Sequence, residues 1–336
     1  MIQEAINILS QNKDLNPEQM QLVMEEIMNA RADTAAIVSF LNALSNKGET
    51  VEELTAAVRV LREHAIKIHI EEKVILDTCG TGADKTGTFN VSTAVAFVVS
   101  ACQITVAKHG NRSVSSCCGS ADVLEELGVN INLSVERIQK CLNDIGIAFL
   151  FAQSLHPAMK NVMPARKQIG KKTIFNILGP LSNPAGATHQ LVGVYDNRWT
   201  EVLAKVLGNL GTVHSLVVHG EDGLDEITTT SSTYIAETNK GKITSYKIVP
   251  EEFGFTRARL EDLKGGDVKD NAKLLSDVLS GKGGPRRDIV LLNAGAAVYT
   301  ADRANSIREG IELAKEAIDS KKALQKLELL KRYSLN

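Results

Sequence analysis

Hydrophobic and polar positions follow two different patterns along the 336 residues. Up to about residue 72, apolar residues recur every three or four positions, which predicts helices without strands. Residues able to cap helices stand before these stretches. Asn16 and Asp33 are candidate N-caps, and Thr50 with Glu53 has the spacing of a capping box. We therefore expect a small helical domain over residues 1–72.

From about residue 73, short apolar runs alternate with polar loops. A strand at 74–76, a polar loop, a helix at 91–102 and a strand at 104–107 form a unit typical of parallel α/β sheets. Further elements are a helix at 121–127, strands at 147–151, 190–195 and 213–218, a hairpin of 234–237 with 242–248, and helices from about 270. The pattern predicts an α/β domain over residues 73–336 with a central, mostly parallel sheet.

Three polar loops follow predicted strands, at residues 77–93, 108–120 and 219–226. Ligands of open parallel sheets bind at the carboxyl ends of strands, so we expect these loops to converge. The first is rich in Gly, Thr and Ser and leads into an apolar helix. Glycines let backbone N–H groups approach an anion, and the helix N-terminus favours negative charge. The composition of this loop therefore predicts a phosphate site. The alternative interpretation is a flexible turn before an ordinary helix N-cap.

Two common nucleotide motifs are absent from the first loop. A phosphate-binding GxxxxGK[ST] motif starting at Gly82 fails because Thr88 stands where Lys is required. A dinucleotide GxGxxG motif starting at Gly80 fails because Lys85 replaces the third glycine. The sequence therefore disfavours a nucleoside triphosphate and a nicotinamide dinucleotide as ligands.

The other two loops offer charges of opposite sign. Lys108 and Arg112 suit a second phosphate or pyrophosphate, although a solvated basic turn has the same composition. Asp225 and Glu226 follow a strand and suit Mg²⁺, which takes one or two carboxylates together with substrate oxygens. Acidic surface turns look alike, so this signal alone is weak.

Composition excludes several classes of partner. The net charge is −2 and aromatic residues make up 4%, which disfavours nucleic acid and anionic membranes. No apolar run reaches about 18 residues, so we expect no membrane-spanning helix. The five cysteines include no CxxC pair, and the first residues do not resemble a targeting peptide. We expect reduced thiols and a cytoplasmic location.

The segments taken together resemble the anthranilate phosphoribosyltransferase family. The resemblance covers roughly residues 77–226 in the family's order: the Gly-rich loop with 90–93, 108–116 with 119–124, 156–160 with 164–166, 175–184, and 223–226. It implies transfer of a phosphoribosyl group from phosphoribosyl pyrophosphate to anthranilate in tryptophan biosynthesis. It also implies a homodimer with the nucleoside phosphorylase/phosphoribosyltransferase type of fold, in which about 165–185 joins the helical domain.

The resemblance assigns roles to individual residues. Two magnesium ions are implied, held by Ser92, Asp225 and Glu226, and no side chain is implied as a general acid or base. Anthranilate positions are Gly80, His109, Asn111 and Arg166. Phosphoribosyl pyrophosphate positions are Gly80, Gly82, Ala83, Asp84, Thr88, Asn90, Val91, Ser92, Thr93, Lys108, His109, Gly110, Asn111, Arg112, Ser113, Val114, Ser115, Ser116 and Ser120. Ala83 departs from the family, which usually has a second Gly there, and we expect a mild effect on the loop.

Other interpretations stay open at this stage. Arg166 could be an exposed helix cation, His109 a hydrogen-bonded loop residue, and His156 a helix cap or turn residue before Pro157. A pyrimidine nucleoside phosphorylase on the same fold is the first rival function. A non-enzymatic nucleic-acid-binding relative is the second.

Overall fold

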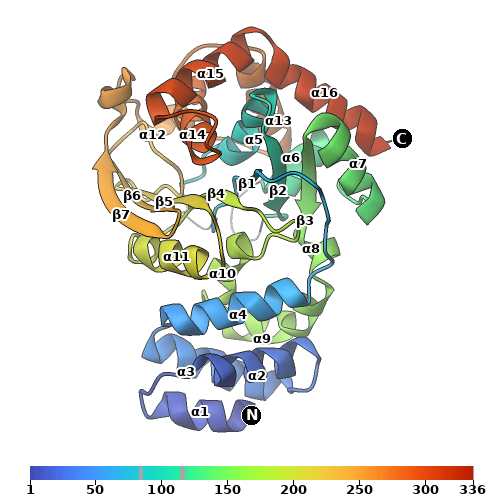
Figure 1. The fold of residues 1–336 in the computed structure, drawn as a ribbon, viewed down its shortest axis with the longest axis vertical. Coiled ribbons are helices and arrows are strands. Elements are labelled where there is room, and N and C mark those ends of the chain that lie inside the picture. The colour runs from blue at the N-terminus through green and yellow to red at the C-terminus, as the bar shows by residue number, and fades with distance from the viewer. Residues whose placement is uncertain (83–85, 114–117, 336) are drawn as a thin grey trace.

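The computed structural model describes residues 1–82, 86–113 and 118–335, which form a helical domain below an α/β domain (Figure 1). Four helices open the chain: α1 (Ile2–Ser10), α2 (Pro17–Met28), α3 (Thr34–Lys47) and α4 (Val51–Glu63). The predicted caps are confirmed. Asn16 and Thr50 head complete capping boxes, and the Asp33 side chain accepts the Ala36 N–H at 2.7 Å.

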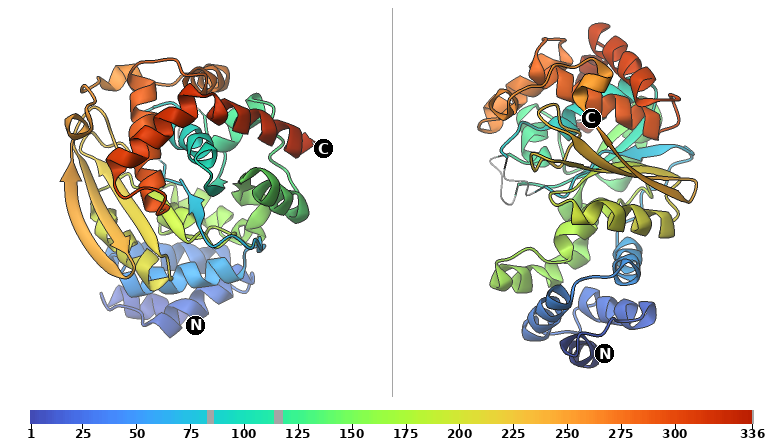
Figure 2. Two further views of the ribbon diagram at one scale, coloured as in Figure 1. Left: turned by 45° about the horizontal axis from the view of Figure 1, so that its top comes forward. Right: turned by 90° about the vertical axis from the view of Figure 1, so that its left-hand side faces the viewer.

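A second stretch of chain returns to the helical domain after strand β3 (Ile147–Phe151). Val162, Ala165 and Ile174 pack with α1–α4 in one hydrophobic core, and Figure 2 shows this stretch beside the N-terminal helices. Its elements are α8 (Ala152–Leu155), η1 (Pro157–Asn161), α9 (Met163–Ile169), α10 (Phe175–Leu178) and η2 (Gly179–Leu181).

The central sheet has the strand order β3-β2-β1-β4-β5-β6-β7. The strands β3, β2, β1, β4 and β5 are parallel, and the last two pairs are antiparallel. The predicted mostly parallel sheet is therefore confirmed. The remaining strand bounds are β1 (Ile75–Asp77), β2 (Thr105–Gly110), β4 (His189–Gly193), β5 (His214–Gly220), β6 (Thr233–Asn239) and β7 (Lys242–Ile248).

One boundary prediction was wrong in a way that matters for the site. Lys108, His109 and Gly110 were predicted to begin a loop, yet they belong to β2. Their backbone pairs with β3 as far as Gly110 opposite Phe151, while β1 ends earlier. Lys108 and His109 thus have a strand backbone, which fixes their side chains more firmly than a loop would.

Alternating residues of the strands face two different hydrophobic cores. Leu191 and Leu216 belong to the core under the C-terminal helices, whereas Val192 and Val217 belong to the core shared with the helical domain. The sheet is thus covered on both faces, as parallel sheets require. The other helices are α5 (Val91–Ala101), α6 (Ser120–Glu126), α7 (Val135–Ile145), α11 (Arg198–Asn209), η3 (Pro250–Phe253), α12 (Leu260–Leu263), α13 (Val268–Leu279), α14 (Pro285–Thr300), α15 (Ile307–Asp319) and α16 (Lys322–Leu335).

No helix in the described part of the chain is long and apolar enough to cross a membrane. The described cysteines Cys79, Cys102, Cys118 and Cys141 are free thiols.

Candidate functional site

The three polar loops meet at the carboxyl ends of the parallel strands. The Gly82 N–H donates to Asp225 Oδ2 at 2.7 Å, and the Ser92 N–H donates to Glu226 Oε1 at 3.2 Å. Lys108 Nζ donates to Ser92 Oγ at 3.2 Å. Segments more than 100 residues apart are thereby joined around the N-terminus of α5, as the strand order requires.

Two glycines allow this close approach. A Cβ atom on Gly193 would overlap the Asp225 carbonyl oxygen, and one on Gly80 would lie 2.8 Å from Asp225 Oδ2. A side chain at position 193 would displace the backbone of the acidic loop, and one at position 80 would displace the Asp225 carboxylate. Gly82 has a different requirement, because its φ of 63° is disfavoured for residues with a Cβ atom.

Lys108 is a buried cation, with 4% of the residue exposed. Its ammonium donates to the Thr78 carbonyl at 2.8 Å as well as to Ser92 Oγ. These partners hold the positive charge beside the start of α5, where the helix dipole is also positive. An anion bound at this point would meet both fields.

Arg112 is held by carboxylates in the same loop region. Its guanidinium pairs with Asp122 at 2.9 Å and with Glu125, and it lies over the Phe151 ring. Asp122 also accepts the N–H groups of Ser113 and Gly119. Asp122 therefore orders the start of the second loop, and the charge of Arg112 is largely balanced by its neighbours.

The remaining described residues of these loops are tied together by their own hydrogen bonds. Asn90 Nδ2 donates to the Cys118 carbonyl at 3.2 Å, which links the first loop to the second. The Ser120 hydroxyl donates to the Asn111 carbonyl, and Asn111 Oδ1 accepts from Gln153. Thr93 Oγ1 is buried and has no hydrogen-bond partner among the described residues. Asn90 thus contacts the second loop at Cys118, whereas Asn111 and Ser120 are joined to each other.

His156 occupies the cap position before Pro157 that the sequence suggested, at the N-terminus of η1. Its side chain makes no capping hydrogen bond, and its ring lies 5.1 Å from that of His109, centroid to centroid. Burial lowers the pKa of His109 to about 3, with His156 adding to the effect, and burial lowers the pKa of His156 to about 4. Both imidazoles are therefore neutral at pH 7. Among the described residues, Nε2 of His156 has no hydrogen-bond partner, and the His109 ring has only a weak interaction with the Gly179 backbone.

Arg166 comes from the helical domain, on α9, and is half-buried. Burial alone lowers its pKa, and no ion pair of its guanidinium occurs among the described residues. A partly desolvated guanidinium favours an anionic partner, because burial of an uncompensated charge is costly. This differs from the exposed helix cation that was the alternative interpretation.

Asp77 is a residue that the sequence analysis missed. It is fully buried at the end of β1, where Oδ1 accepts the His109 N–H at 3.0 Å and Oδ2 accepts from Asn183 Nδ2 at 2.7 Å. Asn183 also donates to the Ala107 carbonyl at 2.8 Å. Burial raises the pKa of Asp77 to about 6, although the nearby Lys108 ammonium opposes the shift. A lone carboxylate after a strand carries no sequence signal that distinguishes this role.

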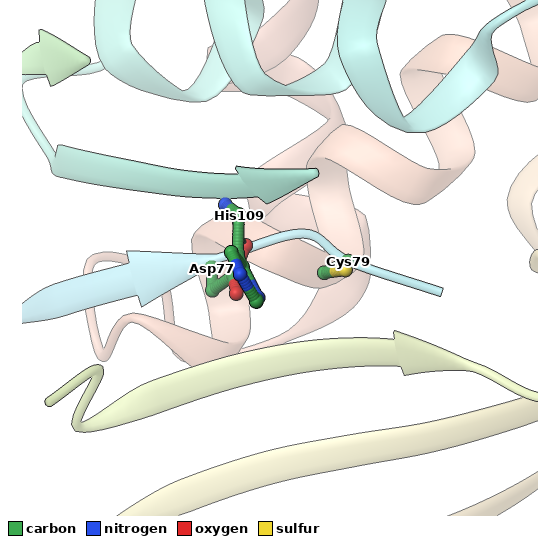
Figure 3. A group of neighbouring side chains, drawn as sticks. All are labelled: Asp77, Cys79 and His109. Atoms are coloured by element: carbon green, nitrogen blue, oxygen red, sulfur yellow. Dashed lines mark hydrogen bonds between the residues drawn. The ribbon is translucent and has the colours of Figure 1, made fainter. Parts of the chain in front are cut away.

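Asp77, Cys79 and His109 gather where β1 and β2 end (Figure 3). One potential ligand atom from each lies within 4.8 Å of the others. Both Asp77 oxygens already accept hydrogen bonds, and burial raises the pKa of the Cys79 thiol. A protonated thiol is a poor metal ligand. The group is better understood as the buried support of the site than as a cation site.

Several predicted positions lie outside the described residues: Ala83, Asp84, Val114, Ser115 and Ser116. The expected effect of Ala83 stays a prediction for that reason.

Comparisons with known proteins place these features in context. Residues 72–324 match the glycosyl transferase family, a/b domain, and residues 3–65 match its helical bundle domain. An anthranilate phosphoribosyltransferase of Symbiobacterium thermophilum is 50% identical over 97% of this chain and 96% of its own. One from Persephonella marina is 50% identical over 99% of both chains.

Solved structures of anthranilate phosphoribosyltransferases have a fold similar to that of this chain. The crystal structure of the Thermus thermophilus anthranilate phosphoribosyltransferase has a TM-score of 0.94, with 40% identity and 99% of each chain covered. The Saccharomyces cerevisiae enzyme in complex with phosphoribosyl pyrophosphate and Mg has a TM-score of 0.91, with 27% identity over 99% of this chain and 98% of its own.

The raised pKa of Asp77 predicts a pH-dependent stability. The folded-state pKa of about 6 lies above the ordinary 3.8, so the folded protein binds more protons between these values and its stability falls as pH rises. Asp77→Asn removes this titration. The free energy of unfolding of wild type minus variant should fall by about 2.4 kcal/mol from pH 4 to pH 7, measured by urea unfolding. The exposed Asp144→Asn is the matched control, and equal slopes for both variants would contradict the prediction.

Proposed function

The chain belongs to the anthranilate phosphoribosyltransferase family, and from this premise we propose that it transfers the 5-phosphoribosyl group from phosphoribosyl pyrophosphate to the amine of anthranilate. Pyrophosphate is released, and the step belongs to tryptophan biosynthesis. The observation that carries the proposal is the meeting of two unlike groups, the N-terminus of α5 with Lys108 and the carboxylates of Asp225 and Glu226. The half-buried Arg166 on α9 adds a third group, a cation suited to an anionic ligand.

Phosphoribosyl pyrophosphate is the ligand we assign to the sheet edge. Backbone N–H groups of the Gly-rich loop, the first turn of α5 and the Lys108 ammonium supply positive potential there. The described residues for this role are Gly80, Gly82, Thr88, Asn90, Val91, Ser92, Thr93, Lys108, His109, Gly110, Asn111, Arg112, Ser113 and Ser120. To contact pyrophosphate, Arg112 would have to exchange part of its pairing with Asp122 and Glu125.

Magnesium is the cofactor we assign to Ser92, Asp225 and Glu226. Hydroxyl and carboxylate oxygens are the ligands that Mg²⁺ prefers. Asp225 accepts the N–H of Gly82 in the Gly-rich loop, and Glu226 accepts that of Ser92 at the start of α5. When bound, magnesium would neutralise the pyrophosphate and act as a Lewis acid. We propose two ions per site. The Saccharomyces cerevisiae relative was solved with phosphoribosyl pyrophosphate and Mg.

Anthranilate is the ligand we assign between the two domains, with Arg166 on its carboxylate. A guanidinium pairs with a carboxylate through two parallel hydrogen bonds. Gly80, His109 and Asn111 are the other assigned positions. The neutral rings of His109 and His156 suit an aromatic ligand, because they are polarisable and do not repel its amine. A Saccharomyces cerevisiae relative with a TM-score of 0.90 and 26% identity was solved in complex with 4-fluoroanthranilate.

The chemistry needs charge stabilisation and positioning. As the bond to pyrophosphate breaks, positive charge develops on the anomeric carbon and negative charge on the leaving group. Lys108 and the start of α5 stabilise the leaving group because they are fixed and partly desolvated. The anthranilate amine is unprotonated at pH 7, so the site needs no strong general base. Arg166 holds the amine in place to attack.

Three further proposals concern the oligomeric state, the location and the domain division of the protein. The active form is a homodimer, the enzyme is cytoplasmic, and residues 1–72 with about 165–185 form one domain against 73–336. The packing of Ala165 and Ile174 with the first four helices supports the assignment of 165–185 to the helical domain.

The direct test of the function follows anthranilate fluorescence. The purified protein should consume anthranilate only when phosphoribosyl pyrophosphate and Mg²⁺ are both present, with release of pyrophosphate. A parallel assay with thymidine and phosphate should give no turnover. Thymidine cleavage without anthranilate consumption would reject the proposal in favour of a nucleoside phosphorylase.

The role of Arg166 predicts a selective defect. Arg166→Ala should raise the KM for anthranilate by about 10- to 100-fold, because a charge-assisted hydrogen bond contributes about 1.5–3 kcal/mol. The KM for phosphoribosyl pyrophosphate should change little. Steady-state kinetics measure both, and Lys167→Ala, an exposed neighbour on α9, is the control. Equal effects on both substrates would mean that Arg166 does not bind the carboxylate.

The acidic pair predicts a magnesium defect. Asp225→Asn with Glu226→Gln keeps the oxygens that accept the Gly82 and Ser92 N–H groups but removes the charges. The magnesium concentration for half-maximal activity should rise by about 10-fold or more. Glu221→Gln, an exposed residue of the same loop that pairs with Lys247, is the control. An unchanged magnesium titration in the double variant would remove these residues from the metal site.

A further inference from the structure

A cation–π contact joins the two walls of the proposed site. Lys172 Nζ lies 3.2 Å from the centroid of the Tyr195 ring. Lys172 follows α9, which carries Arg166, and Tyr195 follows β4, beside the Gly-rich loop. A cation this close to the face of an aromatic ring is attracted by the ring's quadrupole. The contact therefore bridges the two domains.

Lys172 is tied closely to Arg166. Gly170 ends α9 in the left-handed conformation, and its N–H donates to the Arg166 carbonyl at 3.1 Å. On the other side of Lys172, the Thr173 N–H donates to Asn176 Oδ1 at 2.9 Å. The short segment between Arg166 and Lys172 is thus fixed at both ends. A displacement of Arg166 moves Lys172 with it.

Tyr195 is tied closely to the Gly-rich loop. Its N–H donates to Thr81 Oγ1 at 3.1 Å, and the Thr81 N–H donates to the Gly193 carbonyl at 2.8 Å. The next residue, Gly82, donates its N–H to Asp225 Oδ2 at 2.7 Å. Tyr195 is therefore two hydrogen bonds from the carboxylate we assign to magnesium. A displacement of the Gly-rich loop moves Tyr195 with it.

We propose that Lys172 and Tyr195 are positioning residues that couple the two walls, so that anthranilate and phosphoribosyl pyrophosphate each strengthen the binding of the other. This inference rests on the proposed function. Each substrate stabilises the placement of its own wall, and the Lys172–Tyr195 contact stabilises the arrangement in which the two placements agree. Two ligands that stabilise the same arrangement bind with positive and reciprocal coupling.

The test measures the interaction factor between the substrates. It is the factor by which saturation with one substrate lowers the dissociation constant of the other, taken from initial rates over a grid of both concentrations. Wild type should have a factor above one. Because Lys172 is exposed, Lys172→Met and Tyr195→Leu should each bring it toward one by about 2- to 5-fold, the range of an exposed cation–π contact. Both KM values should then rise together, a pattern that the Arg166→Ala defect does not share.

Matched variants separate this contact from a general effect of substitution. Lys172→Arg and Tyr195→Phe keep a cation and a ring, and they should retain most of the coupling. Lys171→Met removes an exposed neighbouring cation and should behave as wild type. In the double variant Lys172→Met with Tyr195→Leu, the loss should be no greater than in either single variant.

A second measurement avoids turnover. Anthranilate fluorescence titrations with and without magnesium pyrophosphate, which lacks the ribose, should show tighter anthranilate binding with pyrophosphate in wild type and not in Lys172→Met. An active wild type with the same interaction factor as Lys172→Met overturns this inference alone. Additive losses in the double variant overturn it as well. A wild type that does not consume anthranilate overturns the proposed function, and the inference with it.

Discussion

Three chain segments meet at the carboxylate of Asp77, and the floor of the site depends on that junction. One oxygen holds the backbone of β2 at His109 and the other holds Asn183, which in turn reaches the Ala107 carbonyl. Burial opposes the charge on this group, while three N–H donors and the nearby Lys108 ammonium favour it. The hydrogen bonds of Asp77 and Asn183 hold the backbone of β2 near its carboxyl end. They thereby position Lys108 and His109.

The buried polar side chains near Asp77 are of two kinds, those with hydrogen-bond partners in the protein and those without. Lys108 is satisfied by the protein itself, through the Thr78 carbonyl and the Ser92 hydroxyl. Within the described residues, Arg166 forms no ion pair and the His109 ring has only a weak interaction with the Gly179 backbone. Satisfied groups rigidify a site, whereas unsatisfied buried groups are costly until a ligand pairs with them. The unsatisfied groups lie toward the helical domain, which is where we place the aromatic substrate.

Local chemistry made much of this arrangement predictable from the sequence. The caps at Asn16, Asp33 and Thr50 and the parallel sheet follow from residue types and periodicity, and the polar loops follow from their place after strands. The end of β2 was missed because pairing with β3 depends on a strand some 40 residues later. The role of Asp77 and the pairing of the His156 ring with that of His109 were missed for a related reason. Their roles come from burial and from neighbours distant in the chain, which no local pattern records.

Gly193 shows how far the acidic loop constrains residues that bind nothing. The Asp225 carbonyl occupies the space that any side chain at position 193 would need. Substitution of Gly193 is therefore disfavoured, even though the residue offers no group to a ligand. Homologous chains that place the acidic loop in the same way should keep Gly at position 193. The exposed residues within the loop should vary more freely. A backbone contact of this kind is a marker of function that residue chemistry alone does not reveal.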